Sequence, residues 1–176
     1  MSVVIREAML EDSREIARVQ VDTWRATYRT IVAQSYLDEM DYNVRAERWR
    51  EQFATGSSRT YVAEKDGTVC GFISGGRLRE PLVAFDGEIY ALYIEPEAQR
   101  CGGGRAMMRE LAAVLLQDGL TSGVVWVLER NPACNFYARL CGELVGRQTI
   151  RIGDEELVEV AYGWKDLRVL AEGSLC

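Results

Sequence analysis

A run of three glycines beside two arginines is the feature of this sequence whose chemistry is easiest to state. Residues 95–105 read E-P-E-A-Q-R-C-G-G-G-R, where a strand pattern gives way to a helix pattern. Glycines let the backbone turn tightly and direct its N–H groups outward, and a helix N-terminus adds partial positive charge. Arg100 and Arg105 flank the glycines and can neutralise further negative charge. We therefore expect this turn to bind a pyrophosphate.

Other phosphate-binding and nucleophilic systems fit the sequence poorly. A Walker A loop ends in Gly-Lys-Ser/Thr, which the chain lacks, and a dinucleotide fingerprint would need a glycine where Met107 stands. The chain has no histidine, which excludes Ser-His-Asp and Cys-His nucleophiles and histidine-based metal sites. The cysteines form neither a CxxC pair nor a zinc pattern. We expect no metal site, and chemistry carried by carboxylates, tyrosine, cysteine, lysine, backbone amides or a cofactor.

The elements that would position this turn alternate between helices and strands. Helical patterns cover about residues 12–28, 43–53, 104–118 and 131–140, and strand patterns cover about 3–7, 60–64, 68–74, 88–94, 124–128, 143–151 and 155–164. The strand–helix–strand unit between Glu88 and Leu128 predicts a parallel strand pair with a right-handed crossover. A chain of 176 residues with nearly half of them apolar suits one domain, residues 1–176, of mixed α/β (α+β) class.

Two motifs in this element order resemble the GNAT superfamily of N-acetyltransferases. The most diagnostic family motif, Q/R-x-x-G-x-G/A, matches residues 99–104, directly after the strand at 89–94. A second motif, N-x-x-x-x-F-Y-x-x-x-G, matches Asn131, Phe136-Tyr137 and, one residue late, Gly142. The resemblance covers nearly the whole chain. It implies a mixed twisted sheet of about six to seven strands flanked by helices, with a parallel central pair splayed to admit coenzyme A.

The resemblance also implies acetyl-CoA as the cofactor, bound between the fourth and fifth strands. Backbone N–H groups of the glycine turn would bind the pyrophosphate, and the pantetheine arm would pair with residues 92–94 like an added strand. A backbone N–H near Tyr93 or Ile94 would polarise the thioester carbonyl. The implied cofactor-binding residues are Leu92, Tyr93, Ile94, Gln99, Arg100, Cys101, Gly102, Gly103, Gly104, Arg105, Asn131, Asn135 and Tyr137.

The implied reaction is direct attack of a primary amine on the acetyl group in a ternary complex, which raises two proton problems. An ammonium with a pKa near 10.4 is neutral only about 1 time in 2,500 at pH 7, so a base or water must take its proton. The departing thiolate must gain a proton or be stabilised. Tyr137 matches the family tyrosine that contacts the sulfur, and it is our candidate acid. The alternative is an aromatic ring that only packs beside Phe136.

Glu88 is our candidate base, acting directly or through water. It begins the cofactor-binding strand eleven residues before Gln99, the spacing of a catalytic glutamate in the histone-acetylating branch of the superfamily. Burial would have to raise its pKa to make it an effective base. The alternative is a solvated carboxylate at a strand end.

Trp24 and Tyr28 are candidate substrate-binding residues, because the first helices border the acceptor pocket in this family. They also share a helical stripe with Ala17 and Val21, so the alternative is a role in the core. Two other functions stay open: a non-catalytic acyl-CoA-binding or regulatory module, and an unrelated nucleotide-binding protein. Tyr137 and Glu88 together favour the enzyme, and the second motif argues against the nucleotide-binding protein.

Charge and composition narrow the partners. The formal net charge is −6, which argues against nucleic acid and suits a cationic amine, whether small molecule or peptide. No apolar stretch is long enough to span a membrane, and the first residues do not resemble a signal peptide, so we expect a cytoplasmic protein without membrane contact. Homodimers are common in the family, and a homodimer is therefore one assembly to test.

Overall fold

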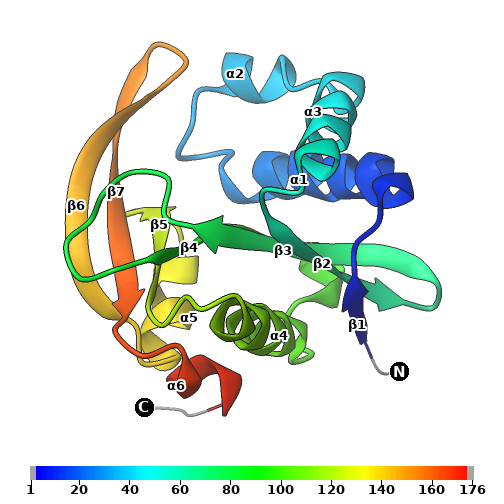
Figure 1. Ribbon diagram of the computed structural model, residues 1–176. Coiled ribbons are helices and arrows are strands. Elements are labelled where there is room, and N and C mark those ends of the chain that lie inside the picture. Colours follow the sequence, from blue (N-terminus) through cyan, green and yellow to red (C-terminus); the bar gives the residue numbers. More distant parts are fainter. Residues whose placement is uncertain (1–2, 174–176) are drawn as a thin grey trace.

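A seven-stranded sheet forms the centre of the computed structural model, which describes residues 3–173 (Figure 1). The strands are β1 (Val4–Glu7), β2 (Arg59–Lys65), β3 (Thr68–Arg77), β4 (Gly87–Ile94), β5 (Gly123–Leu128), β6 (Glu143–Ile152) and β7 (Glu155–Trp164). They lie in the order β1-β2-β3-β4-β5-β7-β6. β4 and β5 are parallel, and the other neighbouring pairs are antiparallel. The predicted mixed sheet with a parallel central pair is confirmed.

Helices cover both faces of this sheet. They are α1 (Ser13–Thr27), α2 (Gln34–Asp38), α3 (Tyr42–Thr55), α4 (Gly103–Gln117), α5 (Ala133–Arg139) and α6 (Arg168–Ala171). α1 and α3 lie on one face and α4 on the other (Figure 1). α2 falls in a stretch where the sequence pattern predicts no element. None of the helices in the described chain is long and apolar enough to cross a membrane.

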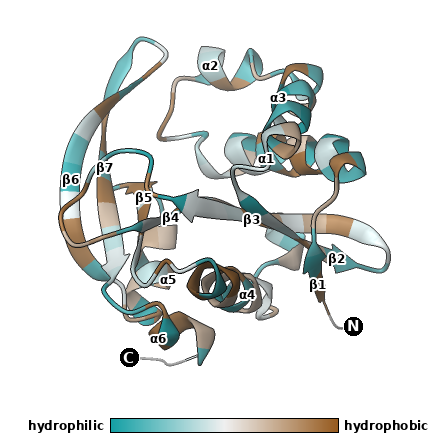
Figure 2. Cartoon of the chain, viewed as in Figure 1, coloured by the Kyte–Doolittle hydropathy of each residue, from teal (hydrophilic) through white to brown (hydrophobic). Residues whose placement is uncertain are grey.

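Alternation along the central strands divides the core between the two faces, because successive side chains of a strand point to opposite sides. Ile89 of β4 and Val125 and Val127 of β5 pack in one cluster with the α4 residues Met107 and Leu111. On the other face, a second cluster joins α1 and α3 to β2 and β3 through Ile16, Trp49, Val62 and Phe72. α4 is accordingly one of the most hydrophobic segments in Figure 2.

The parallel pair β4–β5 is closed at one end and open at the other. Pairing is confined to Gly87–Ile89 against Gly123–Val125, although β4 continues to Ile94 and β5 to Leu128. At the closed end the Asp86 carboxylate accepts hydrogen bonds from the backbone N–H groups of Thr121 (3.0 Å) and Ser122 (2.9 Å). Beyond Ile89 the two strands diverge, and a wedge-shaped opening separates them.

The β6–β7 hairpin reaches across this opening toward α1 and α2 (Figure 1). Near its turn, Ile152 is in a buried cluster with Tyr28 and Leu37. The Glu155 carboxylate accepts a hydrogen bond from the Ala33 N–H at 3.0 Å. The hairpin and the α1–α2 segment therefore form adjoining walls on the α1 side of the sheet.

Candidate active site

A cavity of about 1350 Å³ occupies the space between the diverging strands. Its walls come from β4, β5, the turn before α4, α5, α1, the β3–β4 loop and the β6–β7 hairpin. Most of the residues predicted from sequence line it: Trp24, Tyr28, Glu88, Leu92, Tyr93, Ile94, Gln99, Arg100, Gly102, Gly104, Arg105, Asn131 and Tyr137. Three do not line it, namely Cys101, Gly103 and Asn135. Cys101 and Asn135 are exposed on the surface, and Gly103 is buried at the start of α4.

The glycine turn forms the basic end of the cavity. Gly102 has a φ of +82° and precedes the first turn of α4, a backbone conformation that favours glycine. A Cβ atom on Gly104 would lie 3.1 Å from Ile94 Cδ1 and 3.3 Å from Phe136 Cζ, so glycine allows α4 to approach β4 and α5 closely. The first N–H groups of a helix have no partner within it. Together with Arg100 and Arg105, which flank this turn and line the cavity, they form a site suited to phosphate groups.

The edge of β4 forms the long wall of the cavity. β3 pairs with β4 from Gly87 to Ile94, with a bulge at Tyr90, whereas β5 pairs with it only up to Ile89. Backbone groups of residues 90–94 that face β5 therefore have no strand partner. An extended ligand could pair with this edge as an additional strand would.

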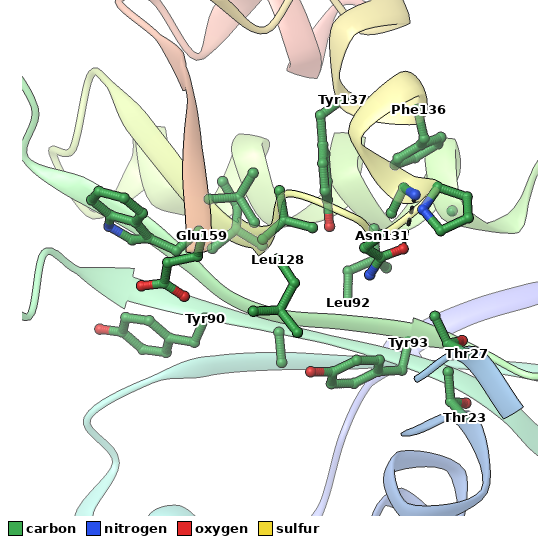
Figure 3. A pocket seen from close by; sticks show the side chains of 18 of the residues that line it. Thr23, Thr27, Tyr90, Leu92, Tyr93, Leu128, Asn131, Phe136, Tyr137 and Glu159 are labelled. Carbon is green, nitrogen blue, oxygen red and sulfur yellow. Dashed lines mark hydrogen bonds between the residues drawn. The ribbon is translucent and has the colours of Figure 1, made fainter. Parts of the chain in front are cut away.

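Tyr137 lies on α5, and its hydroxyl points into the cavity (Figure 3). Its side chain is buried against the rings of Phe136, Tyr162 and Trp164, with centroid distances of 5.4, 6.1 and 6.3 Å. The hydroxyl makes no hydrogen bond within the described part of the chain. Burial raises the pKa of Tyr137 above its ordinary value. The phenol thus keeps its proton and can donate a hydrogen bond to a ligand atom.

Glu88 is buried at the closed end of the strand pair, with 3% of its surface exposed. Its Oε2 accepts a hydrogen bond from the Arg79 backbone N–H at 3.1 Å. Its Oε1 accepts hydrogen bonds from the Arg79 guanidinium. Both oxygens are therefore occupied by Arg79, a residue that the sequence analysis did not select.

Asn131 connects the two sides of the cavity. Its side-chain oxygen accepts a hydrogen bond from the Ala133 N–H at 2.9 Å, and its Nδ2 donates to the Tyr28 hydroxyl, also at 2.9 Å. The Tyr28 ring lies edge-on to Trp24, with 4.7 Å between centroids. The Trp24 indole N–H lies close to the Tyr93 hydroxyl, and its interaction with that oxygen lowers the pKa of Tyr93 in part against the effect of burial. The Thr23 hydroxyl is buried without a hydrogen-bond partner in the described chain. An unpaired buried polar group is costly, so the Thr23 hydroxyl is available to a polar atom of a ligand.

Comparison with known proteins identifies the family to which this site belongs. The model of the acetyltransferase (GNAT) family matches residues 19–142. The chain belongs to the GNAT acetyltransferase family. It is 41% identical over 169 residues to the uncharacterized N-acetyltransferase YuaI of Bacillus subtilis, and the match covers 96% of each chain. Family membership and this relative make the protein an N-acetyltransferase.

Two more distant similarities support the same family. The spermidine N(1)-acetyltransferase of Thermoplasma acidophilum is 23% identical over 136 residues, which are 74% of this chain and 81% of that one. The crystal structure of the PaiA N-acetyltransferase from the same organism, in complex with coenzyme A, superimposes with a TM-score of 0.70 at 18% identity. It covers 93% of this chain and 100% of that chain. This structural likeness shows that the two proteins share a fold.

Several residues of the acetyltransferase site were missed by sequence reasoning. Arg79, Tyr90, Trp126 and Glu159 all line the cavity. Tyr90 and Glu159 come from β4 and β7, and their side chains lie beside one another in Figure 3. Strand alternation could have indicated Trp126, since Val125 and Val127 face α4. The β3–β4 loop that contains Arg79 has no pattern from which its place could be predicted.

Proposed function

We propose that this N-acetyltransferase binds acetyl-CoA in the opening between β4 and β5 and transfers its acetyl group to a primary amine. The observation that carries the proposal is the divergence of the two strands after Ile89. It leaves an unpaired backbone edge between a basic glycine turn and the hydroxyl of Tyr137. Bound there, acetyl-CoA supplies an activated thioester.

The fit of this opening to coenzyme A rests on the chain's own groups. The N–H groups at the start of α4, with Arg100 and Arg105, would hold the pyrophosphate. The free edge of β4 at Leu92–Ile94 would pair with the amides of the pantetheine arm, and an N–H near Tyr93 or Ile94 would polarise the thioester carbonyl. The glycine at position 104 lets the start of α4 lie close to β4 and α5, because a Cβ there would press on Ile94 and Phe136.

Tyr137 would stabilise or protonate the leaving thiolate. When the amine nitrogen bonds to the acetyl carbon and the carbon–sulfur bond breaks, negative charge develops on sulfur. A phenol whose pKa is raised by burial holds its proton until that charge appears, and then donates a hydrogen bond or the proton itself. The products are an N-acetylated amine and a free thiol.

Glu88 would accept the proton that the amine loses through a chain of water molecules. It stands five residues before Tyr93 on β4, ~17 Å along a strand, and water would have to link the amine to its ion pair with Arg79. Both residues line the same cavity as Tyr137. The acid would then lie on α5 and the base on β4, and both would line one cavity.

The acceptor would enter on the α1 side, where Trp24 and Tyr28 line the cavity. A cationic amine is favoured by the net charge of −6. The relative that is named for spermidine, a polyamine, also supports this class of acceptor.

The test combines calorimetric titration of the protein with acetyl-CoA and a free-thiol release assay across a panel of amines. Binding followed by thiol release with one class of amine is the expected result. Binding without release on any amine would favour the alternative, a non-catalytic acyl-CoA-binding module. Absence of binding would contradict the proposed cofactor site itself.

A further inference from the structure

The α1 side of the cavity contains a carboxylate that no described ion pair neutralises. Glu159 of β7 lines the cavity and is half-buried. Its Oε1 accepts a hydrogen bond from Gln148 Nε2 at 2.6 Å, and no ion pair involves it within residues 3–173. Gln148 therefore fixes the orientation of the carboxylate and leaves its other oxygen available.

The arginines that share this part of the cavity are already paired with other carboxylates. Arg79 bonds to Glu88, and Arg147 lies 3.2 Å from Glu129. The ion pair with Glu88 raises the pKa of Arg79, and the charge of Glu159 makes only a smaller contribution. A cationic ligand would therefore meet net negative charge at Glu159.

Aromatic and aliphatic side chains surround the approach to Glu159. Val125 and Val127 face α4, so strand alternation places Trp126 and Leu128 on the α1 side. Leu128 joins the buried cluster of Tyr28 on that side. In Figure 3 the Glu159 carboxylate lies beside the Tyr90 ring, with Leu128 between it and Tyr137. The Arg79 guanidinium already lies over the Tyr90 ring, 4.5 Å from its centroid, so these side chains offer a ligand apolar packing for its methylene groups.

Glu159 is set apart from the expected reaction centre. The thioester carbonyl would lie near Tyr93, and Glu159 lies beside Tyr90, three residues earlier on β4. Three residues of strand span ~10 Å. A carboxylate at this distance can bind a second charge on the same molecule, away from the nitrogen that reacts.

We propose that Glu159, oriented by Gln148, binds a second ammonium group of a diamine acceptor. This inference rests on the proposed acetyl transfer in the same cavity. The reacting amine would lie near Tyr137, the methylene chain along Leu128 and the aromatic rings, and the distal ammonium against the Glu159 carboxylate. Glu159 is thus a specificity-determining residue, and it takes no part in proton transfer.

The experiment compares 1,4-diaminobutane with n-butylamine as acceptors for the wild-type enzyme and the Glu159→Gln variant. Charge-assisted hydrogen bonds contribute enough that Glu159→Gln should raise KM for the diamine about 10- to 100-fold, with little change in kcat. KM for n-butylamine should stay unchanged. Calorimetric titration of 1,4-diaminobutane into the enzyme–coenzyme A complex should show the same loss of affinity without any turnover.

Glu156→Gln is the matched control, because it removes the same charge from an exposed position on the same strand, outside the main cavity. It should change neither KM nor binding. Equal effects of Glu159→Gln on both amines, or a fall in kcat with a changed pH profile, would overturn the diamine proposal and leave acetyl transfer intact. So would turnover of monoamines or peptide N-termini in preference to diamines. Absence of thiol release with every amine tested would overturn both proposals.

Discussion

Tyr137 and Glu88 line one cavity but differ in their hydrogen bonding. The Tyr137 hydroxyl is unpaired among the described residues and faces the open space, whereas both oxygens of Glu88 are held by Arg79. The glycine turn could be predicted from sequence because the residues that give it its chemistry are adjacent in the chain. The Arg79–Glu88 pair could not, because a loop of irregular conformation determines whether the two side chains meet.

Tyr137→Phe should lower kcat about 100-fold, the lower range for loss of a general acid. Binding of acetyl-CoA should change little, because the ring and its packing remain. Initial rates of thiol release and calorimetric titration measure the two quantities. Tyr162→Phe is the control, since that ring packs on Tyr137 at 6.1 Å but does not line the cavity. Full turnover by Tyr137→Phe would contradict its role as the acid.

Glu88→Gln should lower kcat by a similar factor, about 100-fold, because it removes the base. Arg79→Gln separates this role from a structural one, because it frees both carboxylate oxygens. A base freed in this way should keep or gain activity. Parallel losses of kcat in the two variants would mean that the ion pair only supports the β3–β4 loop.

At the scale of elements, the closed end of the β4–β5 pair determines the shape of the opening. Asp86 holds the β3–β4 loop to the start of β5 through Thr121 and Ser122. Burial alone would raise the pKa of Asp86, but hydrogen bonds from these two residues outweigh it, and the pKa lies below its ordinary value. The ionised carboxylate is therefore the form that stabilises this junction.

Asp86→Asn should lower the free energy of unfolding at pH 7 by about 1–2 kcal/mol, the scale of hydrogen bonds to a charged group that is partly solvated. An aspartate whose pKa is lowered by folding stabilises the protein above its unfolded-state pKa of about 3.9. That contribution is lost as the pH falls through the lower, folded-state value. Urea unfolding should thus show the difference between wild type and variant in full at pH 7 and shrinking below about pH 4. A difference that is independent of pH would contradict the assignment.

The strands and long helices of the fold were predictable from sequence, and the remaining elements were not. Hydrophobic periodicity and the hairpin signal at Asp66-Gly67 indicated β2, β3 and α4 to within a few residues. α2 has only five residues, and it is held by Leu37 in a cluster shared with β5 and β6. Such an element depends on tertiary contacts that no local pattern records. For the same reason Glu159, brought to Tyr90 by sheet order alone, was not predicted as a site residue.

For the whole molecule, the net charge of −6 should influence the capture of substrates. At low salt the screening length is about 30 Å, and at physiological ionic strength it is about 8 Å. We expect kcat/KM for a cationic acceptor to fall several-fold between these conditions, because long-range attraction is lost. An uncharged aromatic amine serves as the control. Equal salt dependence for the two acceptors would show that the protein's field does not guide the acceptor.

The divergence of β4 and β5 also has a consequence for the exchange of backbone amide protons. Along residues 91–94, amides that point to β3 are in a ladder, whereas those that point to β5 have no strand partner. Alternate amides should therefore exchange slowly and quickly with solvent deuterium. Acetyl-CoA bound along this edge would slow the fast set alone. One strand would then report occupancy of the cofactor site residue by residue, without any chemistry taking place.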